Sequence, residues 1–95
     1  MNLRMLEEFV EFSKALNFST AAKLLHMSQS SLSKHMSELE RTIGFTLVSR
    51  DAPMTLTPAG KLFLESAEDI LFRYNETLAA CRRLQHQRQG RITVH

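Results

Sequence analysis

The sequence predicts a mainly α-helical domain with a small β-hairpin and a long final helix. Apolar residues recur at helical spacing through three successive segments, and β-forming residues gather in one short stretch between residues 45 and 57. After that stretch a helical pattern continues for about 31 residues. Only three glycines and two prolines occur among 95 residues, which leaves little room for the many turns of an all-β fold.

Length and composition exclude several classes of protein. Ninety-five residues form one small domain without room for a separate catalytic half. The chain is 43% hydrophobic and 23% charged, as folded domains are and disordered chains are not. A single cysteine, Cys81, excludes an internal disulfide and indicates a reducing compartment. Because we find neither a signal-peptide pattern nor an apolar run near the ~18 residues of a membrane span, we expect a cytoplasmic protein without a membrane partner.

Two helices are expected in the first part of the chain. From Asn2 to Leu16, apolar residues cover about half of a helical wheel, which fits a helix facing its own core or one that also meets a second subunit. The rest of that wheel is polar and holds Arg4, Glu7, Glu8, Glu11 and Lys14. Ser19 is a suitable N-cap for the next helix, Thr20 to His26, because its hydroxyl can accept hydrogen bonds from free amides.

The third helix, from Gln29 to about Ile43, is the most informative segment. Met27 and Ser28 form a tight connection before it, with Ser28 as its N-cap, and Gly44 ends it. Four apolar residues recur at steps of four, three and four and fall within an arc of about 60°. These are Leu32, Met36, Leu39 and Ile43, and the opposite side carries Ser30, Lys34, Ser37 and Arg41, with Ser33 to one side.

A hairpin and a long helix complete the chain. Phe45 to Arg50 and Met54 to Thr57 are expected as short strands around the turn residues 51–53. Thr57 is expected to cap a helix from Pro58 to about Arg88, which would be about 46 Å long and must protrude from so small a domain. The chain is expected to leave this helix at Gly90 and to begin a strand-like alternation.

Two apolar stripes run along the final helix. One stripe can cover the helix's own domain, and we expect the other to pair with a second copy of the chain. The alternative is a monomer whose helix end is frayed. The residues expected in dimerisation are Phe63, Ala67, Ile70, Leu71, Tyr74, Leu78 and Cys81.

A helix, a tight turn and a second helix with a small polar and basic face are what reading duplex DNA requires. The major groove is about 12 Å wide and admits one helix, whose outer face must offer hydrogen-bond donors and acceptors. Residues at helix N-termini can bring hydroxyl and amide groups to phosphates. The candidate DNA-binding residues are Ser19, Thr20, Ser28, Gln29, Ser30, Ser33, Lys34, Ser37 and Arg50, the last being the hairpin's cation.

The simpler interpretation of this polar face is that it only meets solvent, because the formal net charge of +2 is weak evidence for nucleic acid. Two details favour DNA. Serine is a poor helix former, which a merely solvated face has no reason to use. Glu38 and Glu40 lie toward the C-terminal half of the third helix, which leaves its N-terminal half free of negative charge.

Together these motifs resemble the DNA-binding domain of LysR-type transcriptional regulators. The resemblance reaches to about Val94 and is carried by Asn2 to Arg4, Phe9, Asn17 to Met36, Leu39-Glu40, Gly44, Leu47, Arg50 and Leu56 to Gly60. It implies a winged helix-turn-helix over residues 1–57, a linker helix over 58–89 that pairs in a homodimer, and the start of an absent effector-binding domain at 90–95. A small-molecule effector would bind only in that further domain.

The resemblance also implies roles for single residues. Ser19, Thr20, Gln29 and Ser33 would contact phosphates, Ser30 and Lys34 would contact base edges, and the wing would touch DNA near Arg50. Lys34 stands where the family often has arginine, and lysine cannot form the two-pronged contact that arginine makes with guanine.

An enzyme or a metal site is not indicated. His26, His35, His86, His95 and Cys81 lack the spacing of metal ligands, and no nucleophile-elbow motif is present. We therefore expect no catalysis, no metal and no cofactor. The remaining alternative is a winged-helix module that binds a protein through the serine face, which salt titration would separate from DNA binding.

Overall fold

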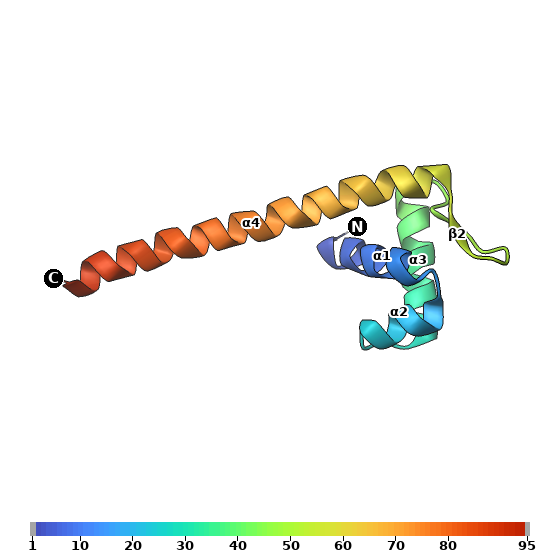
Figure 1. Cartoon of the computed structure of the whole chain (residues 1–95), viewed down its shortest axis with the longest axis horizontal. Coiled ribbons are helices and arrows are strands. Elements are labelled where there is room, and N and C mark those ends of the chain that lie inside the picture. Colours follow the sequence, from blue (N-terminus) through green and yellow to red (C-terminus); the bar gives the residue numbers. More distant parts are fainter. Residues whose placement is uncertain (1, 95) are drawn as a thin grey trace.

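The computed structural model describes residues 2–94, and the side chains of residues 2–87. The elements follow one another as α1 (Leu3–Ala15), α2 (Phe18–Leu24), α3 (Gln29–Ile43), β1 (Val48–Ser49), β2 (Thr55–Leu56) and α4 (Pro58–Val94). Figure 1 shows α1, α2 and α3 gathered in one body near the start of α4, with the hairpin projecting beside them. The predicted fold class, mainly α with a small hairpin and a long final helix, is confirmed.

The helix α2 begins and ends earlier than predicted. Its N-cap is Asn17, whose side-chain oxygen accepts a hydrogen bond from the backbone N of Thr20 at 2.9 Å. The prediction that Ser19 caps this helix is wrong, because Asn17 supplies the acceptor two residues earlier. The helix stops before His26, whose φ of 56° lies in the left-handed region and turns the chain toward α3.

The ends of α3 are as predicted. The Ser28 hydroxyl oxygen accepts from the backbone N of Ser31 at 3.1 Å and so caps the first turn. At the other end Gly44 takes a φ of 91°, a conformation that strains residues with a Cβ atom. The helix therefore runs over the predicted range, and its apolar and polar sides keep the predicted register.

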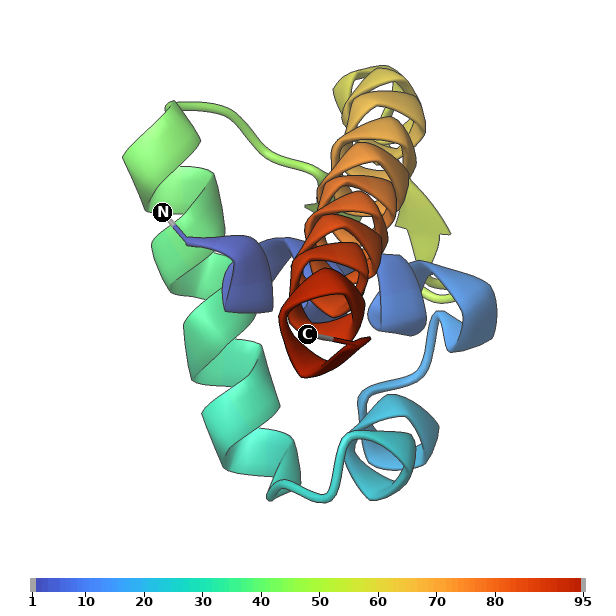
Figure 2. The ribbon, with the colours of Figure 1, turned by 90° about the vertical axis from the view of Figure 1, so that its left-hand side faces the viewer.

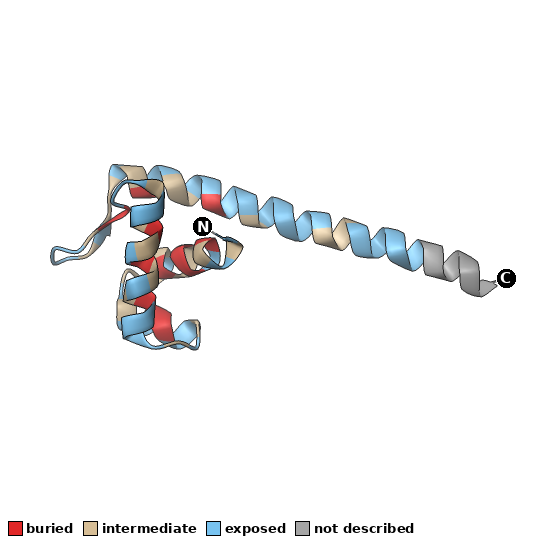
Figure 3. Ribbon diagram, turned by 180° about the vertical axis from the view of Figure 1, so that it is seen from behind, coloured by how far each residue is buried: buried red, intermediate tan, exposed pale blue. Residues whose placement is uncertain are grey.

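The core lies where α1, α2, α3 and the first turns of α4 meet. The apolar arc of α3 points into it, and the rings of Phe9 on α1 and Phe63 on α4 meet edge-on with centroids 5.6 Å apart. Figure 3 shows the buried positions of the short helices facing one another. The buried apolar residues are Leu6, Phe9, Phe12, Ala21, Ala22, Leu32, Met36, Leu39, Leu47, Val48 and Ala67.

The hairpin is present, but its strands are shorter than predicted. Only two residue pairs face each other, Val48 with Leu56 and Ser49 with Thr55. The backbone N atoms of Leu47 and Val48 instead donate to the Glu40 carboxylate at 2.8 and 3.1 Å. The Glu40 carboxylate therefore takes the backbone donor of Leu47, which a longer β1 would direct at Thr57.

Thr57 joins the start of α4 to the segment before the hairpin. Its backbone N donates to the Leu47 carbonyl at 2.9 Å, and its hydroxyl donates to the Thr46 carbonyl at 2.7 Å. The same hydroxyl oxygen accepts from the backbone N of Gly60 at 2.9 Å, which is the predicted N-cap. A Cβ atom at Gly60 would overlap the Leu47 carbonyl, so a side chain there would push α4 off the body.

The helix α4 protrudes as expected (Figure 1), and Figure 2 looks along it toward the body. The molecule measures 64 × 25 × 20 Å and has a radius of gyration of 17.7 Å, against about 12 to 13 Å for a compact domain of this length. The expected exit at Gly90 is not found, because the helix continues to Val94. A strand needs a partner, and within residues 2–94 the strands β1 and β2 pair with each other, whereas a helix satisfies its own backbone.

Candidate nucleic-acid interface

The side of α3 that points away from the core is open to solvent. Ser30, Lys34 and Ser37 are exposed on it, and Ser33 is half-buried at its edge. Leu32, Met36 and Leu39 on the opposite side are buried. The helix therefore presents small hydroxyl groups and one ammonium group without a large exposed apolar side chain among them.

The beginning of α2, the beginning of α3 and the hairpin tip surround one surface hollow. It has a volume of about 440 Å³ and is lined by Leu16, Asn17, Phe18, Ser19, Gln29, Arg50, Ala52, Pro53 and Met54. Three of the predicted DNA-binding residues, Ser19, Gln29 and Arg50, thus come from distant parts of the sequence to one place. Free backbone N–H groups in the first turn of a helix attract anions, so the start of α3 adds to the polarity of this hollow.

The hydroxyl of Ser28 forms hydrogen bonds with other residues of the same chain. It donates to the Ser31 hydroxyl at 2.8 Å while accepting from the Ser31 backbone, and the Ser30 hydroxyl lies 3.4 Å from it. Ser28 therefore shapes the first turn of α3, and Ser30 is the serine of this group that the polar face presents outward.

Arg50 turns back toward α3. One terminal nitrogen donates to the Ser37 hydroxyl at 3.3 Å and lies 3.8 Å from a carboxylate oxygen of Glu40. Its guanidinium carbon also lies 5.2 Å from the centroid of the Phe18 ring, within cation–π range. The hairpin's cation therefore links α2, α3 and β1, and Ser37 is engaged by it.

The structural roles of two acidic residues, Glu40 and Glu8, were not predicted from the sequence. Glu40 binds the backbone of the hairpin and attracts Arg50, so it sets the position of the wing relative to α3. Glu8, expected on the polar side of the first helix, is buried and contacts His35 of α3. Helical periodicity contains no signal for either contact, because the partners of each carboxylate lie on other elements.

The predicted dimerisation residues divide into two groups. Ala67 is buried, and Phe63 and Leu71 pack against the core of the same domain, so these three face their own body. Leu78 is half-buried, and Ile70, Tyr74 and Cys81 are exposed. Most residues of α4 beyond the body are exposed in Figure 3.

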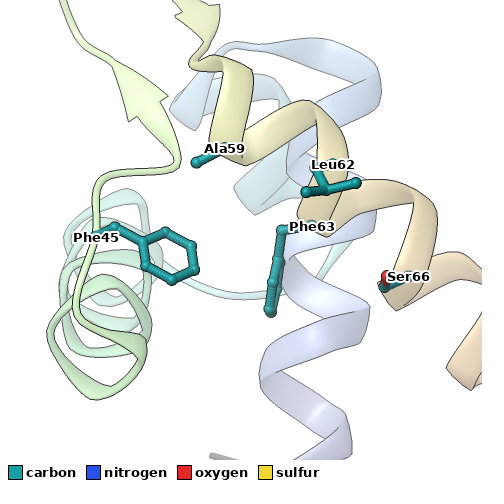
Figure 4. A pocket seen from close by; sticks show the side chains of 5 residues that line it. All are labelled: Phe45, Ala59, Leu62, Phe63 and Ser66. Atoms are coloured by element: carbon teal, nitrogen blue, oxygen red, sulfur yellow. The ribbon is translucent and has the colours of Figure 1, made fainter.

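An apolar hollow lies where α4 leaves the hairpin. Its volume is about 280 Å³, and Phe45, Ala59, Leu62, Phe63 and Ser66 line it (Figure 4). Leu62, an apolar residue to which the sequence pattern assigned no role, is 68% exposed beside it.

No helix in the part of the chain that the structure describes is both long and apolar enough to cross a membrane. Within the same residues, no three His, Cys, Asp or Glu side chains come together in a way that could hold a metal ion.

Known proteins match both the sequence and the fold. Residues 3–61 match the bacterial regulatory helix-turn-helix proteins of the lysR family. The chain is 42% identical over 89 residues to the HTH-type transcriptional regulator CatR of Pseudomonas putida. It is 44% identical over 91 residues to the Hca operon transcriptional activator HcaR of Escherichia coli K12. Each alignment covers 94% of this chain and 31% of the regulator.

Solved structures resemble the whole arrangement, including α4. The BenM DBD in complex with benA site 1 DNA has a TM-score of 0.86 and 30% identity, covering 88% of this chain and 99% of that one. The CbnR DBD–DNA complex has a TM-score of 0.82 and 36% identity, covering 86% and 95%. The chain therefore belongs to the LysR family of bacterial regulatory helix-turn-helix proteins, and it carries the family's winged helix-turn-helix DNA-binding domain together with the long helix that follows.

Proposed function

We propose that this chain recognises specific duplex DNA sequences with α3 in the major groove, as the DNA-binding part of a transcriptional regulator. The observation that carries this proposal is the open polar side of α3, opposite its buried apolar arc. A groove that admits one helix requires an outer face of donors and acceptors without bulky apolar groups. The BenM and CbnR domains, solved with DNA, share this fold.

We assign the polar residues to separate roles. Ser30 and Lys34 point outward from the first turns of α3 and are proposed to contact base edges, which carry the sequence information. Ser33 and Gln29 are proposed to contact phosphates, together with Ser19 and Thr20 at the start of α2. The other three residues of the predicted set, Ser28, Ser37 and Arg50, are proposed to act mainly by shaping α3 and the wing, because each is engaged within the chain.

We infer that two copies pair through the apolar side of α4 that its own body leaves open. Ile70 and Tyr74 are each 46% exposed, and Leu84 is 63% exposed further along the helix. Leu78 and Cys81 lie between them, whereas Phe63, Ala67 and Leu71 are left out because their own domain covers them. A two-fold dimer would present two α3 helices to half-sites about 34 Å apart, or a multiple of that distance.

The remaining functions concern the whole protein. The chain spans 31% of the length of CatR and HcaR. We therefore propose that a small-molecule effector is bound outside the residues described by the structure. Because a regulator must reach the chromosome, we place it in the cytoplasm.

The direct test is binding of the chain to labelled duplexes at several salt concentrations. A duplex selected from a random pool should bind more tightly than a random duplex, and log affinity should fall with log salt by about 0.9 per phosphate contacted. Nuclease footprinting should give two protected half-sites related by a two-fold axis. The proposal would be contradicted by a folded chain that binds no duplex at low salt, or by an affinity that does not change with salt concentration.

A further inference from the structure

The carboxylate of Glu8 is the one charged side chain that is fully buried among residues 2–87, with 2% of its surface exposed. Both Glu7 and Glu8 belong to α1, but Glu7 is exposed whereas Glu8 is buried. Removing a carboxylate from water is costly unless other groups replace the lost hydrogen bonds. The partners of Glu8 therefore determine whether this position is tolerated.

Two side chains supply these partners. The Nδ1 atom of His35 lies 3.0 Å from one Glu8 oxygen and 3.2 Å from the other, and Nε of Arg4 lies 3.3 Å from the second. A carboxylate can only accept hydrogen bonds, so this contact requires the His35 tautomer that carries a proton on Nδ1. Arg4 belongs to α1, whereas His35 belongs to α3. Within residues 2–87 this contact is the side-chain hydrogen bond that joins α1 to α3.

The contact lies close to the polar face of α3 that is proposed to read DNA, because His35 directly follows Lys34 in that helix. Toward α1 and α2 the helix α3 otherwise packs through its apolar arc, and its other polar contacts, from Glu40 and Ser37, reach the hairpin segment instead. Apolar contacts have no preferred direction and tolerate small rolls and slides of a helix. A hydrogen bond depends on both distance and angle, so it restricts the rotation of α3 about its own axis.

We propose that Glu8 is a positioning residue for DNA recognition: through His35 it holds α3 in the rotation that presents Lys34 to the bases. This inference rests on the function proposed above, but Glu8 itself touches no DNA. Base contacts need aligned hydrogen bonds, whereas phosphate contacts depend largely on charge and tolerate small shifts. Loss of the Glu8–His35 contact therefore lowers selectivity more than it lowers general affinity for DNA.

The test compares Glu8→Leu with Glu7→Leu, which removes the same charge from an exposed position of the same helix. Affinities are measured by fluorescence anisotropy for a duplex selected by the wild-type chain and for a random duplex. We expect Glu8→Leu to reduce the ratio of the two affinities about tenfold, as the misalignment of one base contact does. The affinity of Glu8→Leu for the random duplex should stay within about twofold of that of Glu7→Leu, because each variant loses one negative charge.

Stability is measured separately by thermal melting. Glu8→Leu removes one partner of these contacts, but the partners that remain, Arg4 and His35, are 58% and 41% exposed and can return to water. No uncompensated buried charge is left, so Glu8→Leu is expected to fold. A folded Glu8→Leu that keeps the wild-type ratio would overturn the inference whatever its melting temperature. Should this variant fail to fold, His35→Gln replaces it in the comparison, since the His35 ring is 41% exposed and its replacement does not empty the core.

A double variant tests whether the two residues act together. If Glu8 acts through His35, adding His35→Gln to Glu8→Leu should cause no further loss of selectivity. Additive losses would show independent roles and would also overturn the inference. If instead the wild-type chain selects no duplex from the pool, the proposed function itself fails.

Discussion

The apolar residues of the body are buried, whereas several of those on the outer part of α4 are exposed. In the body, Phe9, Phe12 and Leu32 have no exposed surface at all. On α4, Ile70, Tyr74 and Leu84 project from a helix that extends away from the body (Figure 1). The body therefore buries its apolar core within one chain, whereas α4 leaves part of its apolar surface exposed.

This difference separates two kinds of stability. Burial of apolar side chains in the body stabilises the single chain at any concentration. Apolar surface on α4 contributes fully only when a partner covers it, so that contribution depends on protein concentration. The effect of a substitution on stability should therefore depend on protein concentration on α4 but not in the body.

The largest effect is expected for Phe12→Ala. The buried Phe12 ring lies 4.6 Å, centroid to centroid, from the Phe18 ring, and its removal should lower the free energy of unfolding by about 3–5 kcal/mol. Urea unfolding followed by circular dichroism measures this loss. As a matched control, Phe72→Ala on the exposed surface of α4 should change stability by less than about 0.5 kcal/mol. Equal effects would mean that the body is not the stable unit.

Lys34→Glu tests the polar face of α3. It removes the proposed base contact and brings a negative charge to the groove, so affinity for the selected duplex should fall about 100-fold. The melting temperature should hardly change, since Lys34 is exposed. Lys61→Glu makes the same charge change on α4 and should weaken binding far less. Retained selectivity in Lys34→Glu would place α3 outside the groove.

Ile70→Asp tests the open side of α4. A carboxylate in the proposed interface should raise the dissociation constant of the dimer roughly 30-fold, as measured by light scattering over a dilution series. Phe72→Asp places the same charge about 200° away around the helix and should leave the dimer intact. Identical behaviour of the two variants would move the interface to another surface.

The smallest effect is expected for Ser33→Ala. Loss of one phosphate contact should weaken binding about fivefold, equivalent to about 1 kcal/mol. Because a backbone contact carries no sequence information, the selected and random duplexes should be affected alike in anisotropy titrations. A loss confined to the selected duplex would instead assign Ser33 to a base.

Features that depend on neighbours in the sequence could be predicted. The apolar arc of α3, its cap at Ser28, its end at Gly44 and the Thr57 cap of α4 all follow from periodicity or from the chemistry of one position. Even so, the cap of α2 was misassigned. Asn17 and Ser19 are both good capping residues, and in the structure Asn17 holds the N-cap position.

Features that depend on distant partners could not be predicted. Glu40 and Arg50 each carry a charge that a sequence places in solvent or on DNA, yet they meet each other and hold the wing against α3. Their pairing joins residues that only the fold brings together. The late start of β1 follows from the contact between the Glu40 carboxylate and the backbone N of Leu47.

By itself, the sequence determined the order of the helices, the hairpin between them, the two sides of α3 and the length that makes α4 protrude. These properties are local, because a helix or a cap is defined by residues within a few positions of one another. Only the tertiary structure decided that Glu8 is buried against His35, that Arg50 turns back to Ser37, and which part of the α4 surface remains open. Each of these depends on which surfaces meet in space, and helical periodicity does not specify the partner of a side chain.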